Sequence, residues 1–519
     1  MGGGRPPLRP RVRRCRRAMT ITRRGDGGGS SGGKLGSFWE KLNSSFWFVP
    51  AVFVLGAVVL FFATQYLDQL LRADLASLPV VFSGGPSAAR SVLAAIAGSV
   101  ITTVTTAFSL TIVILQLAST SYTPRVLRSF TSDRSVQVVL GTFIATFLYS
   151  LLVLRIIREA SAEGRSFTPV ISVTVAVVLT VACVALLVYF IAHVVNLIQS
   201  STIVQTARRD AMEVIENLDD LGDAPAEDPK APEERPELRG LLSEEPLVVR
   251  ARQSGYVQYL NAGEVVEAIV GRSNAPEGGT LVVEIPFGPG HFVAAGLPLV
   301  RAWPAKEPRS LEDVHDAFYF GKERSFRQDF AFGLRQLSDI ALKGLSPGVN
   351  DPTTAMQAMD QVEVMFVALG EKAMPPRVRE LEVGGAKVVL KVAYYGFDDV
   401  VGLAFDQIRR AAFTSGQVAV LERYLEILGR AIDANRIPER RLALWAGALT
   451  VARLAPNEVS DPRDATELLL GAVKLGERLV GAGVGVEADL EELSGLSEDL
   501  PEGGRIRGAV EEVLRGATR

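Results

Sequence analysis

The stretch FWFVPAVFVLGAVVLFFA, residues Phe46–Ala63, is apolar throughout and determines how the rest of the chain is interpreted. A run of about 18 apolar residues is long enough to enter the hydrocarbon core of a bilayer as a helix. Trp47, at its start, is typical of the aromatic side chains that anchor such helices at the interface. Because no small-residue cleavage site follows at the usual distance, the segment is expected to remain in the bilayer as an anchor.

Three further runs exceed the spanning length, namely Val92–Leu117, Val136–Ile157 and Phe167–Ile198. The sequence therefore predicts about four transmembrane helices in a membrane domain of residues 41–200. A mean hydropathy of +0.22 and a hydrophobic content of 48% agree with a chain whose solvent is partly the lipid bilayer. Beyond residue 205 charged and apolar positions alternate, which is typical of a water-soluble region.

Basic residues near the ends of these runs predict the topology. Arginines follow the second and fourth runs, at Arg125, Arg128, Arg134, Arg208 and Arg209, whereas the loop of residues 65–89 has one, Arg72. By the positive-inside rule both the N- and the C-terminus of this multi-pass protein are then cytoplasmic. Arg155, Arg158 and Arg165 lie near the opposite loop and oppose this assignment, although two of them can extend from the helix end to the interface.

The first 40 residues are rich in Gly and Arg and are expected to form a disordered basic tail, in which Met19 is an alternative start to Met1. The formal net charge of the whole chain is only −3, so no nucleic-acid partner is expected. Cys15, Cys183 and the three histidines are far apart in the sequence. We therefore expect neither a metal site nor a cofactor.

The second apolar run contains polar residues that recur every three, four or seven positions: Ser99, Thr102, Thr106, Ser109, Gln116 and Thr120. This spacing places them along one stripe of a helix. One interpretation is close packing, because Ser and Thr in membranes bond to their own helix and let a neighbour approach. The other is that the stripe lines a water-filled path between subunits, where hydroxyls hydrate an ion or small solute.

His193 lies near the end of the fourth apolar run, one turn before Asn196. It is a candidate pH-sensitive residue, because histidine titrates close to neutral pH. The alternative is a side chain that is simply packed, or favourably placed on the dipole of the helix end.

The soluble region is expected to be α/β. Residues 201–245 predict a helical extension and an acidic, Pro-rich linker, and residues 246–304 a small β-rich module. Residues 305–455 predict a mainly α-helical cytoplasmic domain, and residues 456–519 C-terminal helices and an acidic tail. Individual strands are expected at Leu247–Ala251, Gly255–Tyr259, Leu281–Ile285, Leu299–Trp303 and Val388–Tyr395.

The segment Phe326–Leu345 predicts an amphipathic helix that buries one face and exposes Arg335, Asp339 and Lys343, spaced four apart, on the other. The sequence Gly344-Leu345-Ser346-Pro347-Gly348 overlaps the end of this segment. It matches the G-x-S-x-G pattern of serine hydrolases. A hydrolase needs a strand before the serine and a histidine after it. Because a helix precedes Ser346 and no histidine follows it, we do not expect an enzyme.

Asp351-Pro352 is typical of a helix start. Proline suits the first helical position, and the Asp351 carboxylate can accept a hydrogen bond from the amide of Thr353 or Thr354. The alternative is that Asn350 and Asp351 contact a ligand or a neighbouring subunit.

Several stretches resemble the bacterial predicted membrane proteins of domain-of-unknown-function family 2254 (DUF2254): FSLTIVILQL (Phe108–Leu117), SYTPRVLRSF (Ser121–Phe130), Val138–Arg155, RSFRQD (Arg324–Asp329) and DIALKGLSPGVNDPTTA (Asp339–Ala355). The similarity runs from about residue 40 to residue 450, and SPGVNDPTTA is its most specific part. It implies a multi-helix membrane region followed by a cytoplasmic domain, and it brings no established reaction. Arg324, Asp329 and Asp339 lie in these stretches and are candidate ligand or interface residues.

Two classes of function remain open. The first is a homo-oligomeric channel or transport-related protein, in which the polar stripe lines a path and the cytoplasmic domain assembles or gates it. The second is a non-conducting membrane sensor or scaffold whose cytoplasmic domain binds a ligand or protein partner. The two differ in whether the stripe faces a central axis or a neighbouring helix.

Overall fold

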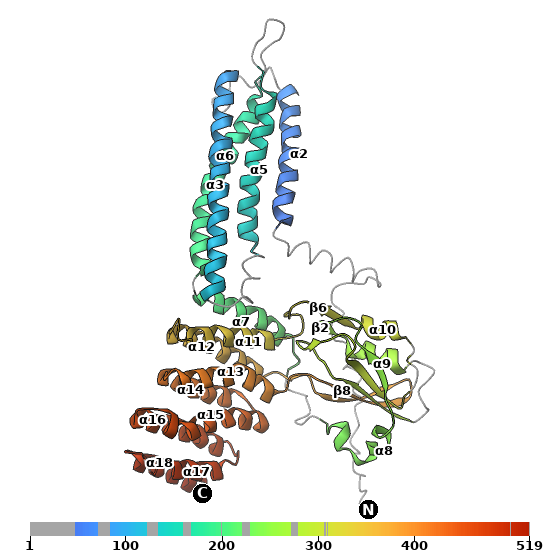
Figure 1. Cartoon of the computed structure of the whole chain (residues 1–519), viewed down its shortest axis with the longest axis vertical. Helices are drawn as coiled ribbons and strands as arrows, with labels where there is room; N and C mark the ends of the chain where they lie inside the picture. The colour runs from blue at the N-terminus through green and yellow to red at the C-terminus, as the bar shows by residue number, and fades with distance from the viewer. Residues whose placement is uncertain are drawn as a thin grey trace, which may run out of the picture. The chain divides into compact units, whose positions relative to one another are not determined.

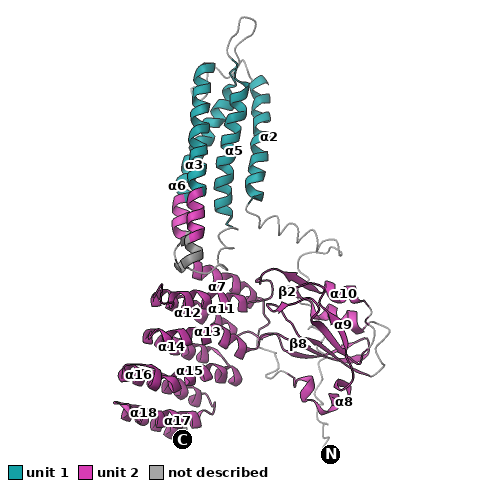
Figure 2. Cartoon of the chain, viewed as in Figure 1, with its two compact units in different colours: residues 1–108, 131–190 teal, residues 109–130, 191–519 magenta. Residues whose placement is uncertain are grey.

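The computed structural model describes residues 47–70, 84–121, 133–158, 168–198, 200–220, 229–270, 279–305, 308, 310–498 and 500–517. The chain divides into two compact units (Figure 2), of which the first comprises Met1–Phe108 and Thr131–Phe190 and the second Ser109–Phe130 and Ile191–Arg519. The predicted basic tail of residues 1–40 lies outside the described residues.

The described residues contain four helices that are long and apolar enough to cross a membrane, as predicted. They are α2 (Phe48–Leu70), α3 (Pro86–Ser121), α5 (Arg134–Ile156) and α6 (Val170–Ile198) (Figure 1). The first helix continues past the predicted end at Ala63, as far as Leu70. The boundary between the two units falls inside α3 and α6, so each of these helices contributes residues to both.

Helix α5 is the central helix of the first unit. In its most apolar stretch of 18 residues, 56% of the residues are buried. The corresponding share is 22% in α2 and 17% in α3 and in α6. Its contact with α2 is close, because a Cβ atom at Gly141 would lie 3.1 Å from the Phe53 ring. Helices α2, α3 and α6 therefore keep faces that other chains or lipid can cover.

The second unit contains two β-sheets. The larger has the strand order β1 (Leu247–Arg250), β5 (Pro298–Trp303), β3 (Thr280–Ile285), β8 (Ala386–Val392) and β7 (Val378–Val383). Within it β3 and β8 are parallel, whereas the other neighbours are antiparallel. The smaller sheet has the order β4 (Phe292–Val293), β2 (Gly255–Leu260) and β6 (Phe318–Gly321). The short helices α9 (Ala262–Val270) and α10 (Leu311–Asp316) join these strands along the chain.

The five predicted strands are all present, as β1, β2, β3, β5 and β8. Strands β7 and β8 come from residues 378–392, beyond the β-rich module predicted at residues 246–304. The sequence predicts a strand in this region at the position of β8 but none at β7. The larger sheet is therefore completed by a segment that follows two helices of the helical part. In the predicted linker, the short helices η3 (Pro232–Glu234), η4 (Pro236–Leu238) and α8 (Arg239–Leu242) precede β1.

Apart from the ends of α3 and α6, the remaining helices of the second unit form a stack: α7 (Ser200–Glu216), α11 (Ala331–Gly344), α12 (Pro352–Leu369), α13 (Phe397–Thr414), α14 (Val418–Ala434), α15 (Pro438–Glu458), α16 (Pro462–Gly481), α17 (Glu487–Leu496) and α18 (Gly503–Ala517). Contacts run along two columns, α11-α13-α15-α17 and α12-α14-α16-α18, as the layers in Figure 1 show. One hydrophobic core continues from α7 to α18. Such layered stacks gain stability from contacts between neighbouring layers.

Helix α11 differs from its prediction at its start and in its burial. It begins at Ala331 and not at Phe326, because the Asp329 carboxylate accepts a hydrogen bond from the Phe332 amide and so caps the first turn. The predicted pair Arg335–Asp339 forms at 3.0 Å, but these side chains are only 25% and 12% exposed. The helix is buried on both sides because it packs between α7, α12 and α13.

Helix α7 enters the stack at close range. Ile203, Ala207 and Ala211 are buried in the shared core. A Cβ atom at Gly333 of α11 would lie 2.4 Å from the Cβ atom of Ala211, so only glycine fits this crossing. At its other end, the Lys372 ammonium donates to the carbonyls of Glu216 and Leu218 and satisfies acceptors that the helix end leaves free.

Candidate functional site

The polar stripe of α3 lies on the exposed side of the helix. Ser99, Thr102, Thr106, Ser109 and Gln116 are all exposed. The buried positions of α3 recur on the opposite side, at Ala89, Leu93, Ile96, Val100, Ala107 and Ile114. Thr120 also belongs to α3, but its side chain lies outside the described part of the chain. The stripe is therefore not the surface through which α3 packs against its own chain.

Three hydroxyl groups of the stripe are bonded to their own helix. Ser99 Oγ donates to the Ile96 carbonyl at 3.0 Å, Thr102 Oγ1 to Gly98 at 2.8 Å and Thr106 Oγ1 to Thr102 at 3.0 Å. Such bonds make a hydroxyl tolerable in hydrocarbon. They also leave the oxygen lone pairs available as acceptors.

Small side chains border the same face. Ala94 and Gly98 are exposed, and no heavy atom lies within 4 Å of the position of a Cβ atom at Gly98. Large aliphatic side chains are exposed on α2 and α6, among them Leu55, Val59, Val178, Val181, Val184 and Val188. Beside its stripe, α3 also exposes large hydrophobic side chains, at Ile101, Phe108, Leu110, Ile112 and Val113. Lipid-facing surfaces have such a composition, whereas small and hydroxylic faces are typical of helix contacts.

A polar network not predicted from the sequence connects α2, α5 and α6. Asp68, buried in α2, accepts from the amides of Ile171 and Ser172 at 2.7 and 3.0 Å and from Ser172 Oγ at 2.5 Å. The Tyr149 hydroxyl lies 2.9 Å from Thr64 Oγ1 and 3.2 Å from the Ser172 carbonyl oxygen. The Asp68 carboxylate thus caps the first turn of α6 and satisfies amides that have no partner within the helix.

A second cluster lies in the other unit, where Arg324 and Asp329 form a bidentate ion pair. Arg324 Nε donates to Asp329 Oδ2 at 2.8 Å and Nη2 donates to Oδ1 at 2.9 Å. The side chains are only 13% and 1% exposed. Burial lowers the pKa of Arg324, but the hydrogen bonds and charge of Asp329 outweigh this effect and raise its pKa above the ordinary value.

Aromatic rings and a glycine enclose this pair. The Arg324 guanidinium lies 5.4 Å from the ring centroid of Phe332 and 5.8 Å from that of Tyr395. The His291 ring stacks on Tyr395 with 5.0 Å between centroids. Gly290 has a φ of +88°, and a Cβ atom there would lie 2.5 Å from Asp329 Oδ2. We refer to Gly290, His291, Arg324, Asp329 and Tyr395 as the Arg324 cluster.

The Arg324 cluster lies where the two parallel strands end. Strand β3 is followed by the turn that carries Gly290 and His291, and β8 by Tyr394 and Tyr395. Burial raises the pKa of the Tyr395 hydroxyl, and the neighbouring Arg324 cation offsets part of this rise. The carboxyl ends of parallel strands are where open sheets bind ligands. Here the cluster joins the sheets to the helical stack, because Asp329 also caps α11.

Asp351 caps α12 as predicted. Its carboxylate accepts from the Thr354 amide at 3.0 Å and from Thr354 Oγ1 at 2.6 Å. These bonds lower the pKa of the Asp351 carboxyl below its ordinary value. Asn350, with a φ of +47°, accepts at Oδ1 from Gln417 Nε2 at 3.1 Å. The pattern Asp-Pro therefore identified the cap correctly.

The five candidates of the soluble region are not gathered in one site. Arg324 and Asp329 pair with each other, and Asp339 pairs with Arg335 on α11. Asn350 and Asp351 lie in the turn between α11 and α12. Ser346, in the same turn, follows a helix as expected and donates to the Lys343 carbonyl at 2.6 Å.

His193, the candidate pH-sensitive residue, is half-buried on α6. Among the described residues, no group of three or more His, Cys, Asp or Glu side chains is placed to hold a metal ion.

Comparison with known proteins agrees with the four candidate spans. The model of a predicted membrane protein family, DUF2254, matches residues 43–430. The chain is 32% identical over 412 residues, 77% of its length, to the uncharacterized proteins Mb1321c of Mycobacterium bovis and Rv1290c of Mycobacterium tuberculosis, of which it covers 74%. No solved structure matches the chain. The chain therefore belongs to the predicted membrane protein family DUF2254.

Proposed function

We propose that the protein is a homo-oligomer of the bacterial inner membrane in which the polar faces of α3 from several copies meet and line a path for an ion or small solute. The observation that carries this proposal is the exposure of Ser99, Thr102 and Thr106 on a membrane helix. The path is neutral, because hydroxyls and one amide make up the stripe. Neutral oxygen ligands can replace part of a hydration shell without a fixed charge.

Helix contact is the first step of the argument. Transmembrane helices associate through small side chains that let their backbones approach, since lipid and aliphatic side chains solvate one another equally well. The α3 face offers Ala94 and Gly98 for such an approach. Association through α3 then places the hydroxyl oxygens of neighbouring copies opposite one another.

The helical stack is proposed to assemble or gate this path from the cytoplasmic side. Within the second unit, Leu115 of α3 packs against the hydrophobic core of the stack. Residues 109–121 of α3 belong to that unit as well, and they include Ser109 and Gln116 of the stripe. A change of packing in the stack would therefore act on the helix that carries the stripe.

Cysteine accessibility tests this proposal. In a background in which Cys15 and Cys183 are replaced, Thr102→Cys and Thr106→Cys should react with a membrane-impermeant thiol reagent in intact membranes. Val181→Cys, on the exposed aliphatic face of α6, is the matched control and should stay unlabelled in hydrocarbon. Protection of both threonine positions together with disulfides between copies would instead indicate a non-conducting scaffold.

A further inference from the structure

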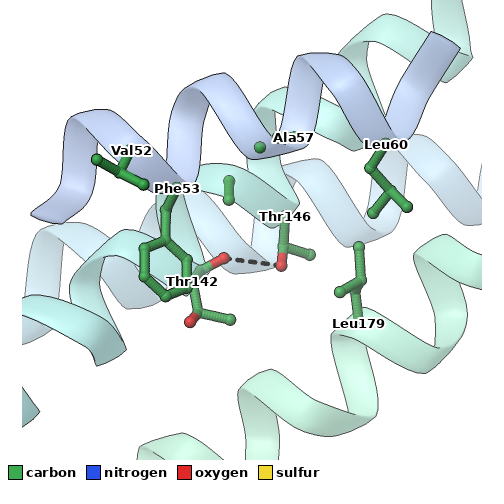
Figure 3. A pocket seen from close by; sticks show the side chains of 9 residues that line it. Val52, Phe53, Ala57, Leu60, Thr142, Thr146 and Leu179 are labelled. Carbon is green, nitrogen blue, oxygen red and sulfur yellow. Dashed lines mark hydrogen bonds between the residues drawn. The ribbon is translucent and has the colours of Figure 1, made fainter. Parts of the chain in front are cut away.

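A cleft of about 330 Å³ opens between α2, α5 and α6 in the first unit. Helix α2 contributes Gly56, Ala57 and Leu60 to its wall, α5 contributes Thr142 and Thr146, and α6 contributes Leu179. In Figure 3 the side chains of Leu60 and Leu179 point toward each other from different helices, and Thr146 lies between them and Phe53 in this view. This surface is distinct from the polar stripe of α3.

The wall of the cleft is almost entirely carbon, although two threonines line it. Thr142 Oγ1 donates to the Val138 carbonyl and Thr146 Oγ1 to the Thr142 carbonyl, both at 2.8 Å. Thr146 Oγ1 also accepts from the thiol of Cys183, at 3.3 Å. A stable internal water needs two to four polar partners, and the described wall exposes almost no polar surface to hold one.

Gly56 of α2 lines the cleft and leaves open space where a side chain would lie. No heavy atom lies within 4 Å of the position of a Cβ atom at Gly56. The neighbouring side chains of α2 are aliphatic and exposed, with 52% of Val52, 66% of Leu55 and 62% of Val59 accessible. The mouth is thus continuous with a surface whose solvent is hydrocarbon.

We propose that this cleft binds one acyl chain of a bilayer lipid. An acyl chain is thin, flexible and wholly apolar, and it surrounds the helix on the side where the cleft opens. A helix of another copy is about 10 Å wide with its side chains, so a single turn of it exceeds the cleft volume of about 330 Å³. An unfilled cleft would forfeit the dispersion contacts of its lining atoms.

Photo-crosslinking tests the proposal. The protein is reconstituted with a phosphatidylcholine that carries a diazirine in the middle of one acyl chain, irradiated and digested. Cross-links to peptides that contain Thr142 or Leu179 are expected in the parent protein. Gly56→Leu should remove them, because the new side chain fills the cleft without meeting another atom at its Cβ position.

Matched variants make the result specific. Ala63→Leu lies on the exposed side of α2 outside the cleft and should keep the cross-links, whereas Ala145→Leu fills the cleft from α5 and should remove them. Absence of cross-links in the parent, or their persistence in both filling variants, would overturn the proposal. Disulfide-linked dimers of Gly56→Cys in a bilayer would likewise overturn it, by identifying a second copy as the occupant. None of these outcomes depends on the path proposed for α3.

Discussion

Arg324 and Asp329 form a bidentate ion pair against the backbone of Gly290, whose Cβ position would lie 2.5 Å from Asp329 Oδ2 and 3.0 Å from Arg324 Nη2. The pair is nearly inaccessible to solvent, and Asp329 also accepts from the Phe332 amide at the start of α11. Removing one partner of such a buried ion pair destabilises the fold strongly, because the other charge is then buried without compensation. The joint between sheets and stack therefore depends on residue 290 having no side chain.

Gly290→Ala tests this dependence. The substitution should cost about 1 to 2 kcal/mol through its positive φ, and about 3 to 5 kcal/mol more if the new methyl group breaks the pair. Gly296→Ala is the matched control, because Gly296 has a φ of +87° and nothing within 4 Å of its Cβ position. Thermal unfolding of the two variants in the same detergent gives the comparison. Equal loss of stability in both would show that the close contact at Gly290 is unimportant.

Replacements of Asp351 separate a helix cap from a ligand contact. Asp351→Ala should cost about 0.5 to 2 kcal/mol of stability, whereas Asp351→Ser can still cap α12 and should cost far less. Thermal melting and subunit assembly measure the structural effect. If Asp351→Ser melts and assembles like the parent but loses cellular activity, the carboxylate itself contacts a ligand or partner.

The same carboxylate predicts a pH dependence. Its pKa is lowered in the folded state by the Thr354 hydroxyl and amide. A depressed pKa contributes stability that is fully present above the unfolded value, about 3.9, and is lost as pH falls through the folded value. The stability difference between the parent and Asp351→Asn should therefore be constant above about pH 5 and shrink below pH 4. A difference that stays constant down to pH 2.5, with the fold intact, would contradict the assignment.

Topology is predicted by the arginines that follow the second and fourth spans. A reporter that is active only in the cytoplasm should be active when fused after Arg209 and silent when fused after Ala76, which lies between α2 and α3 in the sequence. The two fusions control for each other, because both are made in the same chain. The reverse pattern would place the helical stack and the Arg324 cluster on the other side of the membrane.

The sequence predicts those features that local pattern determines. The four spans follow from uninterrupted apolar runs, and the α12 cap follows from Asp351-Pro352. Strand β7 was not predicted, since Arg379, Glu380 and Glu382 give it the composition of a loop. The charges are tolerated because β7 is at the edge of the sheet. The close contact between Gly290 and the Arg324–Asp329 pair could not be predicted either. These residues are distant in the sequence, and only the tertiary fold brings them together.

The Asp68 network could not be predicted from the sequence for the same reason. Replacing its residues gives the most specific test of the packing in the first unit. Ending the first span at Ala63 placed Asp68 in a loop, where a charge is ordinary. Its partners, the amides of Ile171 and Ser172, follow about a hundred residues later, and Asp68 satisfies them inside the bundle.

Asp68→Ala should therefore lower the melting temperature in detergent strongly, since it leaves two amides and the Ser172 hydroxyl without an acceptor in a medium that offers no replacement. Ser172→Ala removes only one of the three donors and should have a smaller effect. Ser150→Ala is the control, because Ser150 is equally buried but bonds only to the Thr146 carbonyl of its own helix. The expected order of destabilisation is Asp68→Ala, then Ser172→Ala, then Ser150→Ala. If Asp68→Ala melts like Ser150→Ala, the carboxylate does not hold α6 in place, and its burial needs another explanation.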